Sequence, residues 1–139
     1  ALRDLCLDIC RRHTIAPAGV LAHSDVAPPR KKDPGERFDW PWLARSGVGH
    51  WVEPELLGRP GPILALGDEG PDVAAMQQML AAYGYGIEPS GTFDRASEHV
   101  VIAFQRHFRP ARVDGRYDAS TAATLERLTA ELPYDTRTA

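Results

Sequence analysis

The sequence predicts two structural units: the C-terminal part of a larger α/β domain, followed by a small all-α domain of three helices. Three observations support this prediction. The chain opens with a helix that is apolar on one side, residues 53–66 are rich in proline and glycine, and three helices with clear start signals follow. We therefore expect a first unit that shares a sheet and a second unit made only of helices.

Residues 1–13 form the first predicted helix, because the apolar residues at positions 2, 5, 6, 9 and 10 share one face. That apolar face must pack against a sheet or another helix, yet residues 1–60 contain only one short strand candidate, Gly19–Ala22. We expect the chain to be a fragment, or one product of a cleaved precursor, whose other part supplies the sheet. Cys6 and Cys10 are expected to lie in the core rather than to form a disulfide or metal pair.

The composition is that of an ordinary globular protein, with 139 residues, 43 % hydrophobic content and a net charge of −3. This charge argues against a basic nucleic-acid-binding protein. No hydrophobic run in the sequence approaches the roughly 20 residues that a membrane-spanning helix needs.

Three helices are predicted beyond the linker. The first begins at Pro71 and stops at Gly84, the second follows Asp94, and the third follows Asp118 and ends near Pro133. The second helix is apolar on nearly all sides, so we expect it to be the central one. The apolar residues at helical spacing that we expect in the shared core include Met76, Met79, Phe104 and Phe108.

A short internal repeat precedes two of these helices. The tetrapeptides Gly91-Thr92-Phe93-Asp94 and Gly115-Arg116-Tyr117-Asp118 stand 24 residues apart. In each, the glycine favours a turn, the aromatic ring can pack under the helices, and the aspartate can cap the next helix by accepting its free amides. The repeat therefore predicts two equivalent turn-and-cap units.

The candidate site is the proline-rich stretch from His23 to Gly35, which contains an imidazole, carboxylates and lysine amines. Hydrolytic zinc sites use nitrogen and oxygen ligands, usually three from the protein, with water in the fourth position. His23 and Asp33 are two candidate ligands, although spacing alone is weak support because most histidines and aspartates bind nothing. Asp25 is expected to accept backbone amides in a turn rather than to bind a metal.

Residues 22–40 resemble the signature of the type-2 zinc N-acetylmuramoyl-L-alanine amidases, through His-Ser-Asp-x-Ala-Pro-x-Arg-Lys-x-Asp-Pro-Gly and the following Phe38-Asp39-Trp40. The resemblance implies that His23 and Asp33 are zinc ligands and that Lys31 lies beside the reacting carbonyl. It also implies a mixed-sheet α/β domain with a further histidine ligand and a glutamate upstream. Neither can be placed in the 22 residues before His23, so this chain alone should need its missing N-terminal part.

The repeat, together with residues 76–80 and 103–106, resembles the three-helix peptidoglycan-binding domain that is appended to many cell-wall hydrolases. Its implied partner is peptidoglycan. Tyr85 and Arg106 are candidate wall contacts, chosen for the exposed aromatic and cationic character expected of them. The predicted organisation is the C-terminal part of a zinc amidase domain, a linker, the peptidoglycan-binding domain and a tail, over residues 1–57, 58–66, 67–133 and 134–139.

The resemblances imply a zinc-dependent amidase that cleaves the amide between N-acetylmuramic acid and L-alanine in peptidoglycan or muropeptides. The alternative is a non-catalytic peptidoglycan-binding protein with a degenerate or incomplete amidase part. Because amidases that act on the intact wall often carry such a binding domain, we expect the periplasm or cell envelope. His13, His50, His99 and His107 are expected at the surface or at an interface, and among them His50 is the one that deserves comparison with the site.

Overall fold

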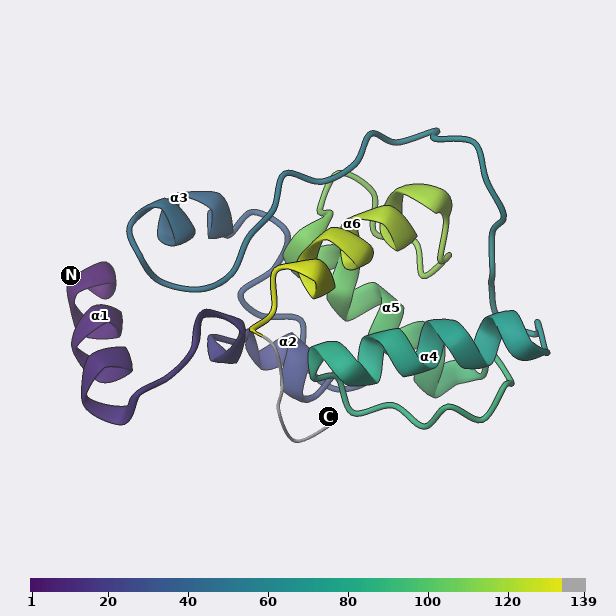
Figure 1. Cartoon of the computed structure of the whole chain (residues 1–139), viewed down its shortest axis with the longest axis horizontal. Helices are drawn as coiled ribbons and strands as arrows, with labels where there is room; N and C mark the ends of the chain where they lie inside the picture. Colours follow the sequence, from purple (N-terminus) through teal and green to yellow (C-terminus); the bar gives the residue numbers. More distant parts are fainter. Residues whose placement is uncertain (134–139) are drawn as a thin grey trace.

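The computed structural model describes residues 1–133, and the expected tail 134–139 lies outside the described residues. The helices α4, α5 and α6 form one bundle, while α1 and α3 lie on the opposite side of the molecule (Figure 1). Helix α2 lies against α5. The elements are α1 (Leu2–His13), a 3-10 turn (Pro17–Gly19), α2 (His23–Val26), α3 (Trp40–Arg45), α4 (Pro71–Tyr83), α5 (Arg95–Phe108) and α6 (Ala119–Ala130).

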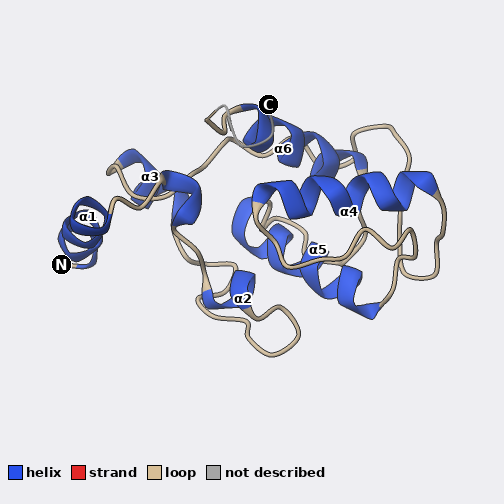
Figure 2. Cartoon of the chain, turned by 60° about the horizontal axis from the view of Figure 1, so that its bottom comes forward, coloured by secondary structure: helices blue, strands red, loops and turns tan. Residues whose placement is uncertain are grey.

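The predicted α/β class is wrong for this chain, because residues 1–133 contain helices and loops and no strand (Figure 2). The strand candidate Gly19–Ala22 instead ends a 3-10 turn, with the Gly19 and Val20 amides donating to the carbonyls of Ala16 and Pro17. A strand needs a second extended segment to accept its hydrogen bonds. No such segment lies beside it among the described residues, so the backbone bonds locally.

The three predicted helices of the second unit are confirmed. Helix α4 follows Gly70 and ends at Gly84, two glycines that both have a φ of 129°. That φ is one that other residues rarely adopt, so these glycines set both ends of the helix. Helix α5 contributes the most to the core and lies centrally. The largest fully buried apolar side chains of this core include Leu80, Phe93, Phe104, Leu125 and Leu128.

The internal repeat forms the two capped turns that were predicted. Asp94 Oδ1 accepts the backbone N–H of Ser97 at 2.9 Å, and Asp118 Oδ1 accepts that of Thr121 at 2.8 Å. The ring of Phe93 is 1 % exposed and that of Tyr117 is 7 % exposed. Each turn therefore buries an aromatic ring and starts the next helix with a side-chain cap.

Two buried glutamines complete the repeat, and the sequence analysis did not predict their role. Gln77 accepts the Gly91 N–H at 2.9 Å and donates to the Thr92 carbonyl at 2.9 Å. Gln105 accepts the Gly115 N–H at 2.9 Å and donates to the Arg116 carbonyl at 2.9 Å. Each glutamine thus pairs with the backbone of one turn from inside the bundle, so no turn amide is buried without a partner there.

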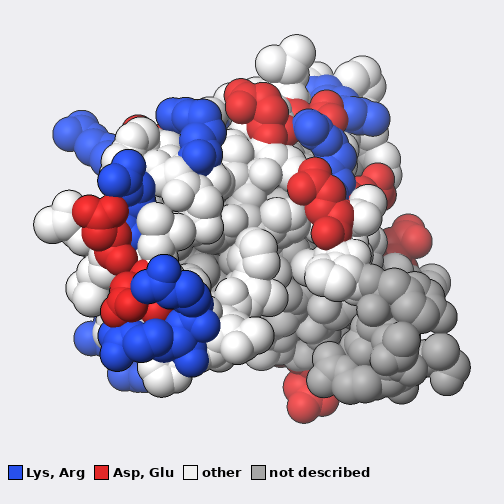
Figure 3. All heavy atoms as spheres, turned by 60° about the vertical axis from the view of Figure 1, so that its left-hand side comes forward, with Lys and Arg blue, Asp and Glu red and all other residues white. Residues whose placement is uncertain are grey.

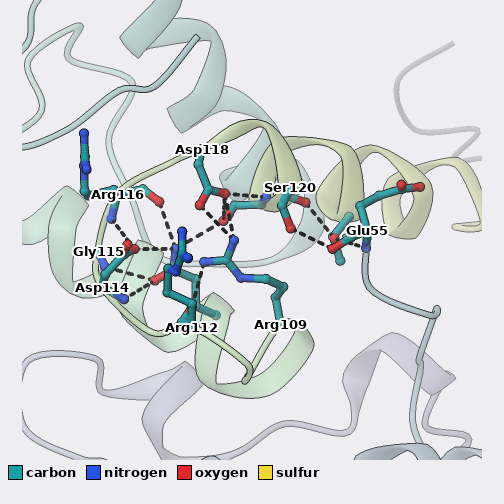
Figure 4. A network of polar contacts seen from close by, with 11 residues as sticks. Glu55, Arg109, Arg112, Asp114, Gly115, Arg116, Asp118 and Ser120 are labelled. Carbon is teal, nitrogen blue, oxygen red and sulfur yellow. Dashed lines mark hydrogen bonds and ion pairs between the residues drawn. The ribbon is translucent and has the colours of Figure 1, made fainter. Parts of the chain in front are cut away.

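The second turn differs from the first by a buried ion pair (Figure 4). Arg109 is 1 % exposed and donates to both carboxylate oxygens of Asp118, at 2.8 and 2.9 Å, and to the Arg112 carbonyl at 2.7 Å. Burial raises the pKa of Asp118, but the hydrogen bonds from Arg109 and Thr121 outweigh it, and the pKa lies below its ordinary value. The carboxylate is therefore held charged beside the guanidinium.

The segment before the bundle packs on α6. Ser120 Oγ donates to the Glu55 carbonyl at 2.7 Å, and the Glu55 amide donates to Thr124 Oγ1 at 3.1 Å (Figure 4). Arg127 donates to the Glu53 carbonyl at 2.6 Å. The chain is thus held on the bundle before it enters residues 58–66, the predicted linker, whose boundaries stay a prediction.

The helix α1 confirms the first predicted helix but has no buried residue. Cys6 and Cys10 are half-buried free thiols, and Leu2 and Leu5 are 50 % and 56 % exposed. A small cluster of Ala22, Trp40, Leu43 and Val48 lies beside it. The idea that a sheet from outside this chain covers the apolar face stays a prediction. No helix of residues 1–133 is long and apolar enough to cross a membrane.

Replacing Asp118 should test the buried ion pair. Asp118→Asn keeps a helix cap but leaves the Arg109 guanidinium without its anion, so we expect the free energy of unfolding to fall by about 2 to 4 kcal/mol at neutral pH. Because the folded pKa of Asp118 is lowered, its contribution is complete above the ordinary value of 3.8 and is lost as the pH falls through the lower folded value. Urea unfolding between neutral and acidic pH measures both effects.

The matched control is Asp94→Asn, at the equivalent cap of the first turn. Asp94 makes the same bonds to Ser97, at 2.9 Å, and no described arginine pairs with it. This variant should therefore lose less than about 1 kcal/mol. Equal losses in the two variants would show that the ion pair adds nothing to the cap.

Candidate functional site

The structure brings together the two side chains that were predicted as metal ligands. His23 begins α2 and Asp33 follows ten residues later, yet His23 Nδ1 and Asp33 Oδ2 are 3.2 Å apart. The Ser24 amide donates to the Asp33 carbonyl at 3.1 Å, and the amides of Arg30 and Lys31 both donate to the Ala27 carbonyl at 3.0 Å. These backbone bonds fold residues 23–33 into a closed loop, which we call the metal loop.

The geometry of this pair fits two ligands of one zinc ion. Tetrahedral bonds of about 2.0 to 2.2 Å place neighbouring donor atoms about 3.3 to 3.6 Å apart, close to the spacing of this pair. One imidazole nitrogen and one carboxylate oxygen are also donors that zinc accepts. The His23 and Asp33 side chains are 50 % and 65 % exposed, so their donor atoms are open to a further ligand. Residues 1–133 contain no group of three His, Cys, Asp or Glu side chains that could hold a metal.

Lys31 lies in the same loop, two residues before Asp33, and its side chain is half-buried. No ion pair or side-chain hydrogen bond joins its ammonium group to another residue in the described part of the chain. On the face shown in Figure 3, lysine and arginine side chains are accompanied by aspartate and glutamate side chains rather than gathered alone.

Asp25, two residues after His23, is the buried charged residue that hydrogen-bonds the metal loop to the helical bundle. Asp25 is 6 % exposed, and its carboxylate accepts three hydrogen bonds. The Ala22 amide donates to Oδ2 at 2.9 Å, as the sequence analysis expected of a turn. Tyr85 Oη donates to Oδ1 at 2.7 Å and His107 Nδ1 lies 2.6 Å from Oδ2, both from the helical bundle. These two contacts were not predicted, because they join residues 60 and 82 positions apart.

The neighbours of Asp25 are themselves buried. His107 is 2 % exposed and stacks on Trp40 of the resemblance signature, with ring centroids 3.8 Å apart and planes 18° apart. Burial raises the pKa of Tyr85 well above its ordinary value, and the Asp25 charge and hydrogen bond raise it further. Tyr85 therefore stays protonated and donates to the carboxylate.

The prediction that the two candidate wall contacts, Tyr85 and Arg106, are exposed is wrong. Tyr85 is only 7 % exposed and bonds to Asp25. Arg106 pairs with Glu36 at 3.0 Å, and its side chain is 15 % exposed. Both lie where the bundle meets the first sixty residues. The sequence showed the type of these two residues but not their partners, which only the packing of the bundle against residues 22–40 decides.

His50 lies at the same boundary between the first residues and the bundle. Its Nδ1 is 2.6 Å from Tyr83 Oη, and its Nε2 is 3.2 Å from Glu131 Oε1. It lines a cavity of about 90 Å³ together with Asp25, Tyr83, Tyr85 and Phe108. His50 is therefore an interface residue, as expected, and within residues 1–133 it does not join the His23 and Asp33 pair.

The bundle matches a known class of protein module. Residues 69–125 match the family described as a putative peptidoglycan binding domain. This match lies inside the predicted range 67–133 and includes both turns of the internal repeat.

Most of the chain is similar to particular amidases. It is 40 % identical over 132 residues to the N-acetylmuramoyl-L-alanine amidase AmiD of Escherichia coli, covering 92 % of this chain and 46 % of that protein. It is 33 % identical over 75 residues to a putative N-acetylmuramoyl-L-alanine amidase of Rickettsia conorii, covering 54 % of this chain and 28 % of that protein. The chain thus spans less than half of either relative.

Solved structures show the same similarity. The complex of Escherichia coli AmiD with the substrate anhydro-N-acetylmuramic acid-L-Ala-D-gamma-Glu-L-Lys superposes with a TM-score of 0.76 at 39 % identity, over 97 % of this chain and 52 % of that one. The structure of AmpDH3 from Pseudomonas aeruginosa has a TM-score of 0.69 at 30 % identity, over 96 % of this chain and 52 % of that one. The predicted resemblances to N-acetylmuramoyl-L-alanine amidases and to a peptidoglycan-binding domain are both confirmed.

Proposed function

We propose that this chain is part of a zinc-dependent N-acetylmuramoyl-L-alanine amidase. Its substrate is the amide between N-acetylmuramic acid and L-alanine in peptidoglycan or muropeptides. The observation that carries the proposal is the 3.2 Å approach of His23 and Asp33 inside the metal loop, in a chain 40 % identical to an amidase. The substrate named in the AmiD complex has the same sugar-to-alanine link.

His23 and Asp33 would hold the zinc ion, and we propose that a further histidine ligand and a glutamate come from outside residues 1–133. When bound, zinc polarises the scissile carbonyl and lowers the pKa of water. Lys31, which the resemblance places beside the reacting carbonyl, would donate to the oxyanion that develops during attack. Asp33 would remain charged as a ligand, which balances part of the positive charge at the site.

Metal content and rate should separate the roles of His23 and Lys31 in the protein that carries all of its proposed ligands. His23→Ala should lose both zinc and activity, because a ligand is removed. Lys31→Ala should keep zinc and lose about 10² to 10³ in kcat, because its partner forms only during reaction. Elemental analysis beside an assay of muramoyl-alanine amide cleavage measures both quantities.

Lys32→Ala is the matched control, since Lys32 is the adjacent, exposed lysine of the same loop. It should keep both zinc and rate. Full activity in Lys31→Ala would remove Lys31 from the mechanism. A correctly assembled wild-type protein that binds no zinc would contradict the amidase proposal and favour the non-catalytic wall-binding protein.

The helical bundle is proposed to bind peptidoglycan and to keep the enzyme at the cell envelope or in the periplasm. Support comes from the family match over residues 69–125 and from a core that the bundle supplies almost entirely by itself. A unit that holds its own core can bind the wall while the metal loop acts on a nearby stem peptide.

Residues 66–132, expressed alone, should fold and sediment with purified peptidoglycan. Circular dichroism and a pelleting assay test the two parts separately. Leu80→Asp is the control, because Leu80 is 0 % exposed and a buried charge should unfold the unit and abolish pelleting. A folded unit that stays in the supernatant would refute the binding role and leave the fold unaffected.

A further inference from the structure

We propose that Tyr85 and His107 of the helical bundle are positioning residues for the zinc site. Through Asp25 they fix the orientation of α2, the helix that carries His23. The inference rests on the zinc site proposed above. Its consequence is that the wall-binding unit also sets the metal affinity of the amidase part.

The length of α2 is the first reason. The helix has four residues, His23–Val26, and one helical turn is unstable by itself. Its orientation must therefore come from contacts with the rest of the protein. His23 itself is exposed, so packing of its own ring does not hold it. Asp25, in the same turn, is the buried charged residue through which such contacts act.

The hydrogen bonds of Asp25 are the second reason. An ionised carboxylate only accepts hydrogen bonds, and a buried one is costly unless donors surround it. One of its three donors, the Ala22 amide, belongs to the metal loop region and moves with it. The other two, Tyr85 Oη and His107 Nδ1, lie on the bundle and are fixed by its core. The bundle thus sets the position of α2.

The rigidity of the two donors is the third reason. The His107 ring lies between Trp40 and Phe108, with a centroid distance of 3.8 Å to each. Its Nε2 is buried without a hydrogen-bond partner among the described residues, so Nδ1 makes its only polar contact. Tyr85 packs edge-on against Phe104, which is 0 % exposed. Neither donor can follow Asp25 if α2 turns away.

The test measures zinc affinity by chelator competition and the absorption spectrum of the Co²⁺-substituted protein, using the protein with all of its proposed ligands. Tyr85→Phe removes one donor to Asp25 without changing the ring, and His107→Phe removes the other while keeping the stack. We expect each to weaken zinc binding by about tenfold and to alter the Co²⁺ spectrum. His107→Asn, which restores a side-chain N–H donor, should recover part of the affinity.

Tyr83→Phe is the matched control. Tyr83 and Tyr85 are both 7 % exposed, and Tyr83 makes a 2.6 Å bond to His50 rather than to Asp25. It should reduce the midpoint of urea unfolding about as much as Tyr85→Phe but leave zinc affinity at the wild-type value. A purely structural role for Tyr85 would give the two variants the same zinc affinity, and that result overturns the inference.

The proposed function fails in a different way. A wild-type protein without zinc, or a His23→Ala variant with wild-type affinity, refutes the zinc site itself. Wild-type affinity in Tyr85→Phe, His107→Phe and Tyr83→Phe, with loss in His23→Ala, refutes only the positioning role. Should His107→Phe not fold, Tyr85→Phe still decides the inference.

Discussion

The buried carboxylate of Asp25 is the constraint on which the arrangement of this chain depends. A charge that is 6 % exposed must be met by donors, and they come from two parts of the sequence far apart. Satisfying that charge brings α2 against α5 and places Trp40 on His107. The first sixty residues and the bundle are therefore joined by a polar contact with specific geometry, rather than by apolar packing alone.

The bundle provides a rigid surface for this contact. Each of its repeated turns is held from outside by an aspartate cap and from inside by a buried glutamine, Gln77 or Gln105. Both glutamines are 0 % exposed, so their bonds are shielded from water and strongly directional. A bundle built this way can position residues outside itself, because its own turns have little freedom.

The proposed amidase part and the proposed wall-binding unit are accordingly not physically independent of each other. The metal loop contains the proposed ligands His23 and Asp33, yet its backbone has few contacts of its own that are not local. The donors that orient it lie on the unit that matches the peptidoglycan-binding family. In the proposed amidase, this arrangement links the stability of the metal site to the folding of the proposed wall-binding unit.

The sequence by itself determined the helices α1, α4, α5 and α6 and the aspartate caps of α5 and α6, since proline, glycine and aspartate act on the backbone within one turn. It did not predict the short helices α2 and α3. It also identified the stretch in which His23 and Asp33 meet. It predicted a sheet that residues 1–133 do not form, because a strand depends on a distant partner. It placed Tyr85 and Arg106 at the surface, whereas the tertiary structure buries Tyr85 against Asp25 and pairs the half-buried Arg106 with Glu36. Such pairings leave no local pattern in the sequence, so only the packing of the bundle against residues 22–40 decided them.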